Sequence, residues 1–146
     1  MKSVMQVVKQ AELLVDNEII SKIGQGLVVF FCVEKDDLEE KLAFFAKKIA
    51  NLRIFSDENG KTNLSVKDIG GEILLVSQFT LAGDCEHGNR PSFSTAESPD
   101  RANELYLRLK GILETEYDLI VKTGVFGAEM IINQVNDGPF TVFLQK

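Results

Sequence analysis

Apolar residues fall in short runs along this chain, and the runs have the length and spacing of β-strands. Residues 3–15 alternate loosely between apolar and polar, turn formers follow at 16–17, and 19–23 predicts the partner strand of a hairpin. The runs 27–33 and 73–76 are continuously apolar, which is typical of strands buried on both faces. Three further runs, 119–123, 130–135 and 140–144, predict the strands that close the fold.

Two segments carry apolar residues at helical spacing. The first is predicted to begin at Asp36 and Asp37, since carboxylates favour the positive end of a helix. The second is predicted to begin at Ser98, Pro99 and Asp100, which suit the residue before a helix and its first turn. The order of strands and helices predicts a layered α/β domain with two main helices packed on mixed sheets. The apolar stripes are Leu38, Leu42, Phe45, Ile49 and Leu52 in the first helix, and Ala102, Leu105, Leu109, Ile112 and Leu113 in the second.

Composition and charge indicate one ordinary globular domain, 1–146. The chain is 45% hydrophobic and 26% charged, and 146 residues are enough to bury a full core. No apolar run reaches the length of a membrane span, and the N-terminus lacks the apolar core of a signal peptide, so we expect a cytoplasmic protein. The net charge of −6 argues against broad contact with nucleic acid, because few basic residues are available to neutralise phosphates.

The residue types that usually form metal or nucleophile sites are sparse here. Cys32 lies in an apolar run, Cys85 lies in a polar loop, and His87 is the only histidine. Their spacing is not that of metal ligands, and the chain has no GxSxG motif and no phosphate-binding glycine loop. We therefore expect no metal and no cofactor.

The segment Asn-Asp-Gly-Pro-Phe-Thr at 136–141 admits two interpretations. It suits a hairpin turn between the last two predicted strands, because Asn, Asp, Gly and Pro are turn residues. The alternative is a cis peptide bond before Pro139, which costs only about 0.5–1 kcal/mol at an X-Pro bond. With Gly138 before it, such a bond would hold two backbone carbonyls in a fixed direction with no side chain in the way.

A second polar segment, Ser77-Gln78-Phe79-Thr80-Leu81, follows a predicted buried strand and places hydroxyl and amide groups at a sheet edge. The irregular stretch 82–97 comes next, and loops of that length are often functional. Thr80 has two interpretations of comparable weight. Its hydroxyl either satisfies backbone groups at the strand end or takes part in catalysis, although no base lies at a recognisable spacing.

These motifs resemble, in order and in register, the D-aminoacyl-tRNA deacylase family. The resemblance is carried by Ser-Gln-Phe-Thr-Leu, by Arg-Pro-Ser-Phe at 90–93, by Gly-Val-Phe-Gly-Ala at 124–128 and by Asn-Asp-Gly-Pro-x-Thr. Asn-Leu-Arg-Ile-Phe at 51–55 and Gly-Gly-Glu at 70–72 also match, and the likeness extends from Val4 to Leu144. It implies a layered β/β/α fold with mixed, mainly antiparallel sheets, working as a homodimer.

The resemblance implies an enzyme that hydrolyses the ester of D-aminoacyl-tRNA, and of glycine mischarged on alanine tRNA, releasing the free amino acid. In the family the terminal ribose 2′-hydroxyl takes part in catalysis, and the protein supplies mostly backbone contacts. Ser77, Gln78, Phe79 and Thr80 are the implied catalytic segment. The 138–139 motif is implied to enter the partner subunit's pocket, where it rejects an L-side chain by a clash.

Phe93, Met130 and Asn136 complete the candidate substrate-binding residues, with Gly138 and Pro139. Phe93 and Met130 suit an adenosine pocket, because a base stacks on aromatic and apolar surfaces, but each also suits a hydrophobic core. Arg90 suits either a phosphate or the end of its own loop. The expected partner is the 3′ end of a tRNA carrying a D-amino acid or glycine, with no DNA and no membrane.

Two positions depart from the family pattern. Family members commonly have Gln-Arg-Val near the N-terminus, where this chain has Gln6, Val7 and Val8. That arginine would help to hold the glycine–proline motif. The loop 83–89 is also more acidic than is common, which predicts lower tRNA affinity or a contact elsewhere.

Two other functions compete with the deacylase. One is a non-catalytic dimeric module that binds a nucleotide or aminoacyl-adenosine, which the acidic charge and the lack of a side-chain catalyst favour. The other is a small-ester or peptide hydrolase that uses Thr80 or Cys85. Turnover of D-tyrosyl-tRNA separates the first alternative from the enzyme, and loss of generic esterase activity in Thr80→Ala or Cys85→Ser tests the second.

Overall fold

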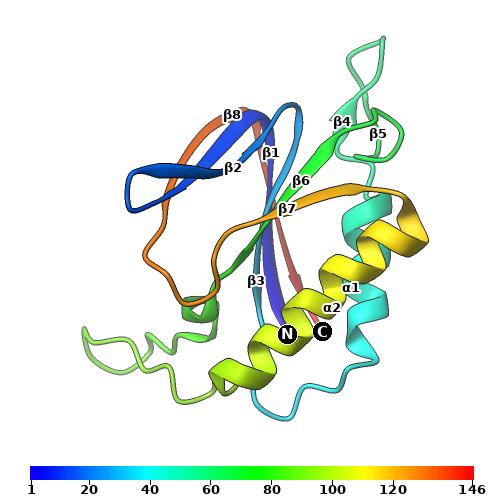
Figure 1. Cartoon of the computed structure of the whole chain (residues 1–146). Helices are drawn as coiled ribbons and strands as arrows, with labels where there is room; N and C mark the ends of the chain where they lie inside the picture. Colours follow the sequence, from blue (N-terminus) through cyan, green and yellow to red (C-terminus); the bar gives the residue numbers. More distant parts are fainter.

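The computed structural model describes residues 1–146 and contains a six-stranded mixed sheet, a two-stranded ribbon and two long helices (Figure 1). The predicted α/β class is confirmed. Strand β1 pairs antiparallel with β2, β3 and β8, whereas the strand pairs β3–β6 and β6–β7 are parallel. The order is β2-β1-β3-β6-β7, with β8 on the free side of β1. The strands are β1 Lys2–Val15, β2 Glu18–Ile23, β3 Gly26–Cys32, β4 Phe55–Ser56, β5 Thr62–Leu64, β6 Glu72–Ser77, β7 Ile120–Thr123 and β8 Ile131–Gln145. The helices are α1 Lys41–Asn51, α2 Pro99–Tyr117 and the short 3-10 turn η1 Phe79–Ala82.

The predicted hairpin at the N-terminus is confirmed as β1 and β2. Asp16 and Asn17 have φ values of 51° and 64°, which lie in the left-handed region that a tight hairpin turn requires. Aspartate and asparagine tolerate this region better than other non-glycine residues, so the turn residues agree with the strand pairing.

The sheet curls and encloses a second core of its own. Met5 and Val7 of β1 point to the helices, whereas Val8 and Leu13 point to the opposite face, so the strand changes its buried side at 7–8. The second core joins Leu13 and Ile23 to Leu74 of β6. Ser21 Oγ donates a hydrogen bond of 2.6 Å to the carbonyl of Thr123, which ties β2 to β7 across the curl. The result is two β layers made from one sheet.

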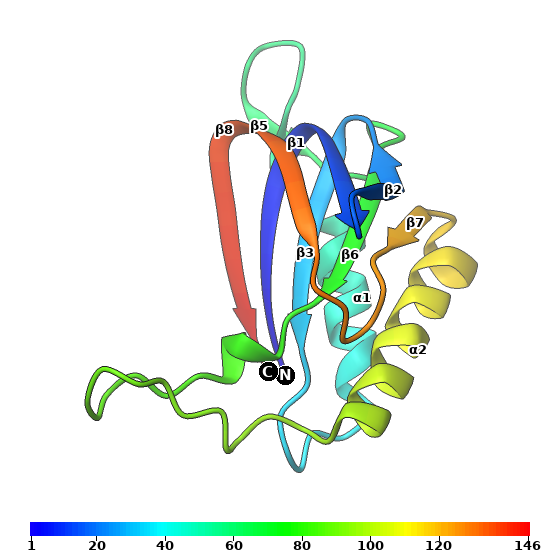
Figure 2. The same ribbon diagram turned by 60° about the vertical axis from the view of Figure 1, so that its left-hand side comes forward.

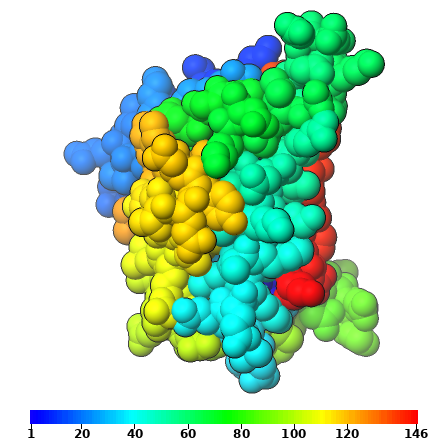
Figure 3. Space-filling model, turned by 90° about the vertical axis from the view of Figure 1, so that its right-hand side faces the viewer, coloured from blue at the N-terminus to red at the C-terminus, as the bar shows by residue number.

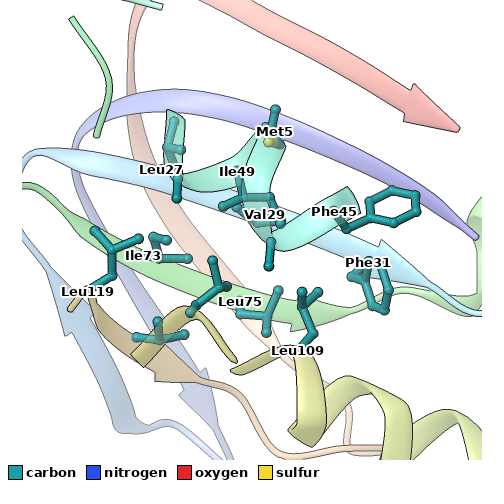
Figure 4. Packing of buried hydrophobic residues seen from close by; sticks show 14 of the residues in the cluster. Met5, Leu27, Val29, Phe31, Phe45, Ile49, Ile73, Leu75, Leu109 and Leu119 are labelled. Atoms are coloured by element: carbon teal, nitrogen blue, oxygen red, sulfur yellow. The ribbon is translucent and has the colours of Figure 1, made fainter. Parts of the chain in front are cut away.

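The helices form the third layer and cover one side of the sheet, as Figure 2 shows. Their outer face is visible in Figure 3, where α1 in cyan and α2 in yellow lie side by side. The main core lies between the helices and strands β3 and β6, and Figure 4 shows Phe31, Leu75 and Phe45 meeting there. The rings of Phe31 and Phe45 pack edge to face with centroids 5.3 Å apart. β3 and β6 are buried on both faces, as their continuous apolar runs predict.

The predicted start of the first helix is wrong, because α1 begins at Lys41 rather than at Asp36. Asp36 has φ 65°, a left-handed conformation that ends any helical run. Asp37 is buried, and its carboxylate accepts hydrogen bonds from the Glu34 backbone N–H at 2.8 Å and from Lys41 Nζ at 2.6 Å, and also pairs with the terminal ammonium. Leu38 is consequently 58% exposed and does not belong to the apolar stripe.

The second helix begins at Pro99 as predicted, although the hydroxyl of Ser98 makes no capping hydrogen bond. Its stripe is confirmed in Leu105, Leu109 and Leu113, which are buried, while Ala102 and Ile112 are half-buried against the main core. The helix ends at Asp118 in the left-handed conformation, where its N–H bonds the carbonyl of Leu113.

The predicted strands 130–135 and 140–144 are parts of one strand, and of the two interpretations of 136–141 the hairpin turn is wrong. β8 is one strand of 15 residues that pairs with β1 on both sides of the motif. Gln6 opposes Thr141 and Val8 opposes Asn136, so four residues of β8 stand opposite Val7 alone. The motif is therefore a large irregular bulge inside one strand. The continued pairing of β8 with β1 on both sides overrides the turn preference of the motif residues.

No helix of the protein is both long and apolar enough to cross a bilayer. The short ribbon of β4 and β5 was not predicted. In the turn that connects them, the Asp57 carboxylate accepts the backbone N–H groups of Asn59 and Lys61.

Candidate functional site

A pocket of about 280 Å³ opens at the carboxyl ends of the parallel strands β3 and β6. Ligands in α/β sheets commonly bind at this edge, because strands stop there and loops diverge. Eleven of its 15 lining residues are hydrophobic, and the polar remainder gives a few fixed contact points. The lining residues are Phe31, Cys32, Val33, Val76, Ser77, Gln78, Phe79, Glu97, Ala102, Tyr106, Phe126, Gly127, Ala128, Met130 and Ile132.

Three residues of the predicted catalytic segment, Ser77, Gln78 and Phe79, line this pocket. Ser77 ends β6, and the Gln78 backbone N–H donates to the carbonyl of Phe31 at 2.8 Å, which ties the segment to β3. Phe79 begins η1, and the first N–H groups of a helical turn have no partner within it. The segment is thus held by the sheet while free donors remain available at its end.

Thr80 lies beside the pocket and does not line it. Its side chain is exposed, and its Oγ1 accepts a hydrogen bond from Gln78 Nε2 at 2.5 Å. No base contacts this hydroxyl. The Thr80 hydroxyl therefore has the Gln78 amide as its side-chain hydrogen-bond partner, and no neighbouring base is in place to activate it.

Of the two predicted base-stacking residues, Met130 lines the pocket and Phe93 does not. Phe93 packs edge to face on Phe79 with ring centroids 5.3 Å apart, and is 37% exposed. A Cβ added at Gly83 would meet the Phe93 ring at 2.9 Å, so a glycine is needed for this close approach. Arg90 is exposed in the same loop and makes no hydrogen bond or ion pair within the chain.

Sequence reasoning gave no role to several residues that the fold brings into the pocket, notably Tyr106, Phe126 and Glu97. Tyr106 comes from α2 and donates from its hydroxyl to the carbonyl of Leu75 at 2.7 Å. Phe126 belongs to the Gly-Val-Phe-Gly-Ala motif, and its ring lies 6.1 Å from that of Tyr106. Of these three residues, only Phe126 lies in a recognisable sequence motif, at 124–128. Tyr106 and Glu97 lie in ordinary helical and loop sequence that does not mark them as pocket residues.

Burial makes the two weakly acidic groups of the pocket poor candidates for proton transfer near neutral pH. Burial, with a smaller effect of Glu34, raises the pKa of the Cys32 thiol to about 11. Burial also raises the pKa of the Tyr106 hydroxyl well above its usual range. Both groups are neutral at physiological pH, so their contribution is shape and hydrogen bonding.

The glycine–proline motif lies away from this pocket within the same chain. Neither Gly138 nor Pro139 lines it, and both are exposed. Figures 1 and 2 show the bend of β8, where the colour passes from orange to red, at the end of the sheet opposite η1. The peptide bond between Gly138 and Pro139 is cis. Gly138 has φ 116°, and a Cβ there would lie 2.7 Å from the Phe140 nitrogen, so only glycine fits.

Three side chains in the acidic loop could act as metal ligands, because ligand atoms of Asp84, Glu86 and His87 lie within 4.8 Å of one another. All three side chains are exposed. Asp84 already accepts the backbone N–H of Glu86 at 2.9 Å, which explains its position without an ion.

Comparison with known proteins identifies the family. The family model described as D-Tyr-tRNA(Tyr) deacylase matches residues 4–145. The chain belongs to this family. The D-aminoacyl-tRNA deacylases of Thermotoga petrophila and Thermosipho africanus are each 51% identical over 146 residues, which is 100% of this chain and 97% of each relative.

Two solved structures extend the family comparison. A structure named c-Myc DNA Unwinding Element Binding Protein is 40% identical, with a TM-score of 0.95 over 100% of this chain and 99% of its own. A probable eukaryotic D-amino acid tRNA deacylase has a TM-score of 0.83 over 98% of this chain and 97% of its own. Its identity is 20%, so that similarity shows the fold alone.

Val7, the departure from the pattern of the deacylase family, lies opposite the bulge and is buried. Side-chain amides bridge the two flanks of the motif instead of an arginine. Gln134 Nε2 donates to Asn136 Oδ1 and to Gln6 Oε1, both at 2.7 Å, and Gln6 Nε2 donates to Thr141 Oγ1 at 3.3 Å. We call Gln6, Gln134, Asn136 and Thr141 the amide bridge. Gln134 Oε1 is buried without a partner, which is the cost of this arrangement.

Proposed function

We propose that this protein hydrolyses the ester bond of D-aminoacyl-tRNA and releases the free D-amino acid and tRNA. The observation that carries the proposal is the pocket at the ends of β3 and β6, lined by Ser77, Gln78 and Phe79, in a chain that matches the deacylase family from end to end. Since its substrate is tRNA, we expect the protein to act in the cytoplasm in proofreading of aminoacylated tRNA.

The chemistry needs no side-chain nucleophile. An aminoacyl ester is activated by its α-ammonium group, so positioning of the ester and stabilisation of the oxyanion supply the rate. Ser77 and the Gln78 amide contact the ester, and the free backbone N–H groups at Phe79 face the developing negative charge. The terminal ribose 2′-hydroxyl assists the attacking water. Thr80 orients Gln78 through the hydrogen bond between their side chains.

The terminal adenosine occupies the apolar part of the pocket. Met130, Phe126 and Tyr106 supply an apolar and aromatic wall to the pocket, which suits the face of a base. Phe93 supports the Phe79 ring from outside the pocket. The acidic net charge agrees with a contact confined to the end of the RNA, where few phosphates need neutralising.

The site is completed by a second copy of the chain. Gly138 and Pro139 are exposed and lie at the far end of their own sheet, so only another subunit can present them to this pocket. β8 also exposes Val135 and Phe143, at 46% and 55%, as an apolar edge. A two-fold dimer through this edge would bury these side chains and exchange the motifs reciprocally.

The motif then acts as the chiral filter. A backbone wall close to the substrate's α-carbon leaves room for hydrogen but not for the side chain of an L-amino acid, so the wrong substrate is rejected by a clash. Glycine has no side chain and passes the same wall. We therefore expect glycine mischarged on alanine tRNA to be hydrolysed as well. The amide bridge keeps Asn136, beside the motif, in place.

The experiment is deacylation of D-tyrosyl-tRNA and L-tyrosyl-tRNA by purified protein without added metal. Rapid release of D-tyrosine alone is the expected result. Gln78→Ala should lose most of this activity, whereas Gln25→Ala, at an exposed glutamine between β2 and β3, should retain it. Release of neither amino acid would contradict the enzyme, and equal release of both would contradict the filter.

The second candidate function is nucleic-acid or nucleotide binding without turnover. It is favoured by the solved structure named for binding a DNA unwinding element, which is 40% identical to this chain. The net charge of −6 opposes broad contact with DNA, so we keep DNA out of the expected partners. Tight binding of duplex DNA at physiological salt, together with no deacylation, would favour this candidate over the enzyme.

A further inference from the structure

Glu97 is the one formally charged residue among those that line the pocket, and the proposed reaction gives it no role. It stands immediately before Ser98 at the start of α2, and only 14% of its side chain is exposed. A mostly buried carboxylate in an otherwise apolar pocket is costly unless donors satisfy it. The Glu97 carboxylate therefore needs hydrogen-bond donors that stabilise it in this pocket.

The backbone holds Glu97 in a fixed place. Its N–H donates to the carbonyl of Val33 at 3.1 Å, just beyond the end of β3. The preceding residues are also tied down, since Thr95 Oγ1 donates to the carbonyl of Ala82 at 3.0 Å and Lys35 N–H donates to the carbonyl of Thr95 at 2.9 Å. The end of the long loop is thus anchored to both β3 and η1, and the carboxylate is preorganised.

The Glu97 carboxylate has acceptor capacity to spare. Oε1 accepts the backbone N–H of Ser98 at 2.6 Å, and Oε2 lies 3.5 Å from Arg101 Nε. An ionised carboxylate offers about four lone-pair sites, so these two contacts leave room for a further donor. Arg101 is about half exposed and also reaches the carbonyl of Asp37, so it does not occupy the carboxylate fully. The remaining acceptor sites are available to a donor group of a ligand in the pocket.

We propose that Glu97 is a specificity-determining residue that accepts a hydrogen bond from the exocyclic amine of the 3′-terminal adenine. The inference rests on the proposed function, which places that adenosine against Met130, Phe126 and Tyr106. We expect a base that stacks on this wall to bring its edge within reach of Glu97, because Glu97 lines the same pocket. Adenine carries an amine donor at C6, whereas inosine carries an oxygen acceptor there, which a carboxylate repels.

The test exchanges donor and acceptor on both partners. Glu97→Gln keeps an oxygen for the Ser98 N–H and turns an amide NH₂, a donor, toward the pocket. A short acceptor-stem RNA ending in CCA or in CCI is charged with D-tyrosine and offered to both proteins. We expect Glu97→Gln to raise KM about tenfold for the adenosine-ended RNA and to lower it for the inosine-ended RNA, with kcat little changed. Glu104→Gln, at an exposed glutamate of α2, serves as the matched control.

The outcomes separate the inference from the proposed function. A reversed preference for the terminal base supports the assignment of Glu97. An equal loss on both RNAs, or a lowered melting temperature with unchanged KM, would mean that the carboxylate only supports α2 and would overturn it. No turnover of the adenosine-ended RNA by the unaltered protein would overturn the proposed function itself.

Discussion

The pocket and the glycine–proline motif are built in opposite ways. The pocket lies at the ends of two strands that are buried on both faces, and its lining includes Phe31 of the main core and Val76 of the second core. The motif is an exposed bulge at a sheet edge, tied across its flanks by Gln6 and Gln134. The proposed catalytic segment therefore lies on well-buried strands, whereas the motif proposed to enter another subunit lies on an exposed bulge. Substitutions in the two regions should therefore separate stability from selectivity.

The largest expected effect is on the stability of the pocket region. Phe31→Ala removes a ring that is 2% exposed and packs against Phe45, and we expect a loss of about 3–5 kcal/mol in unfolding free energy. Phe143→Ala, on exposed β8, should cost far less in unfolding free energy and should instead weaken dimerisation. Urea unfolding and light scattering measure the two quantities. A similar loss of stability in both variants would erase the contrast between the regions.

The next effect is on activity at the motif. Gly138→Ala places a Cβ against the Phe140 backbone at a φ that side chains rarely adopt, which costs about 1–3 kcal/mol locally. If the motif enters the partner's pocket as proposed, a displaced motif no longer fits there, and we expect a loss of about 100-fold in deacylation. Gly60→Ala is the control, since Gly60 also has a positive φ but no atom within 4 Å of the added Cβ. Full activity in Gly138→Ala would refute the filter.

A smaller effect is expected from the amide bridge. Gln134→Ala removes the donor shared by Gln6 and Asn136, so the motif should become freer and the preference for the D-substrate should fall several-fold. Stability should change by no more than about 1 kcal/mol, since these are partly exposed hydrogen bonds. Competition between D- and L-tyrosyl-tRNA measures the preference. An unchanged ratio would show that the bulge holds its shape without the bridge.

The smallest effect concerns the two thiols. The pKa of Cys32 is raised to about 11 by burial, so its thiolate is scarce at pH 8, whereas Cys85 is exposed. Iodoacetamide at pH 8 should label Cys85 and leave deacylation intact. Because the pKa of Cys32 is higher in the folded than in the unfolded state, its contribution to stability is present below pH 9 and is lost as the pH rises toward 11. Rapid labelling of Cys32 in the folded protein at pH 8 would contradict its burial.

Local sequence patterns correctly predicted those helices and strands in which the tertiary environment favours the same conformation as the local sequence. β3, β6 and α2 follow from continuous or periodic apolar residues, because burial and local propensity favour the same conformation there. The start of α1 did not follow. Asp37 has the right type for a helix start, but its carboxylate is engaged by Lys41 and the terminal ammonium, and the chain turns left-handed at Asp36.

Only the part of the pocket that comes from one contiguous segment was predicted from the sequence. Ser77, Gln78 and Phe79 are contiguous and follow a strand, so their place at a sheet edge was visible in the sequence. Tyr106 and Glu97 were not recognised, because what places them there is the packing of α2 and the anchoring of the loop against β3. A residue that reaches a site through tertiary contacts carries no local mark of it.

The sequence by itself determined the α/β class, the central strands, the second helix and the family, because these depend on periodic burial and on motifs that are contiguous. Tertiary structure alone decided that 136–139 lies within a strand, since β1 pairs with β8 on both sides of it and outweighs four turn residues. Tertiary structure also decided which residues surround Ser77 in the pocket, because these residues come from segments far apart in the chain. Pairing and packing energies are summed over many distant residues, and no short window of sequence contains them.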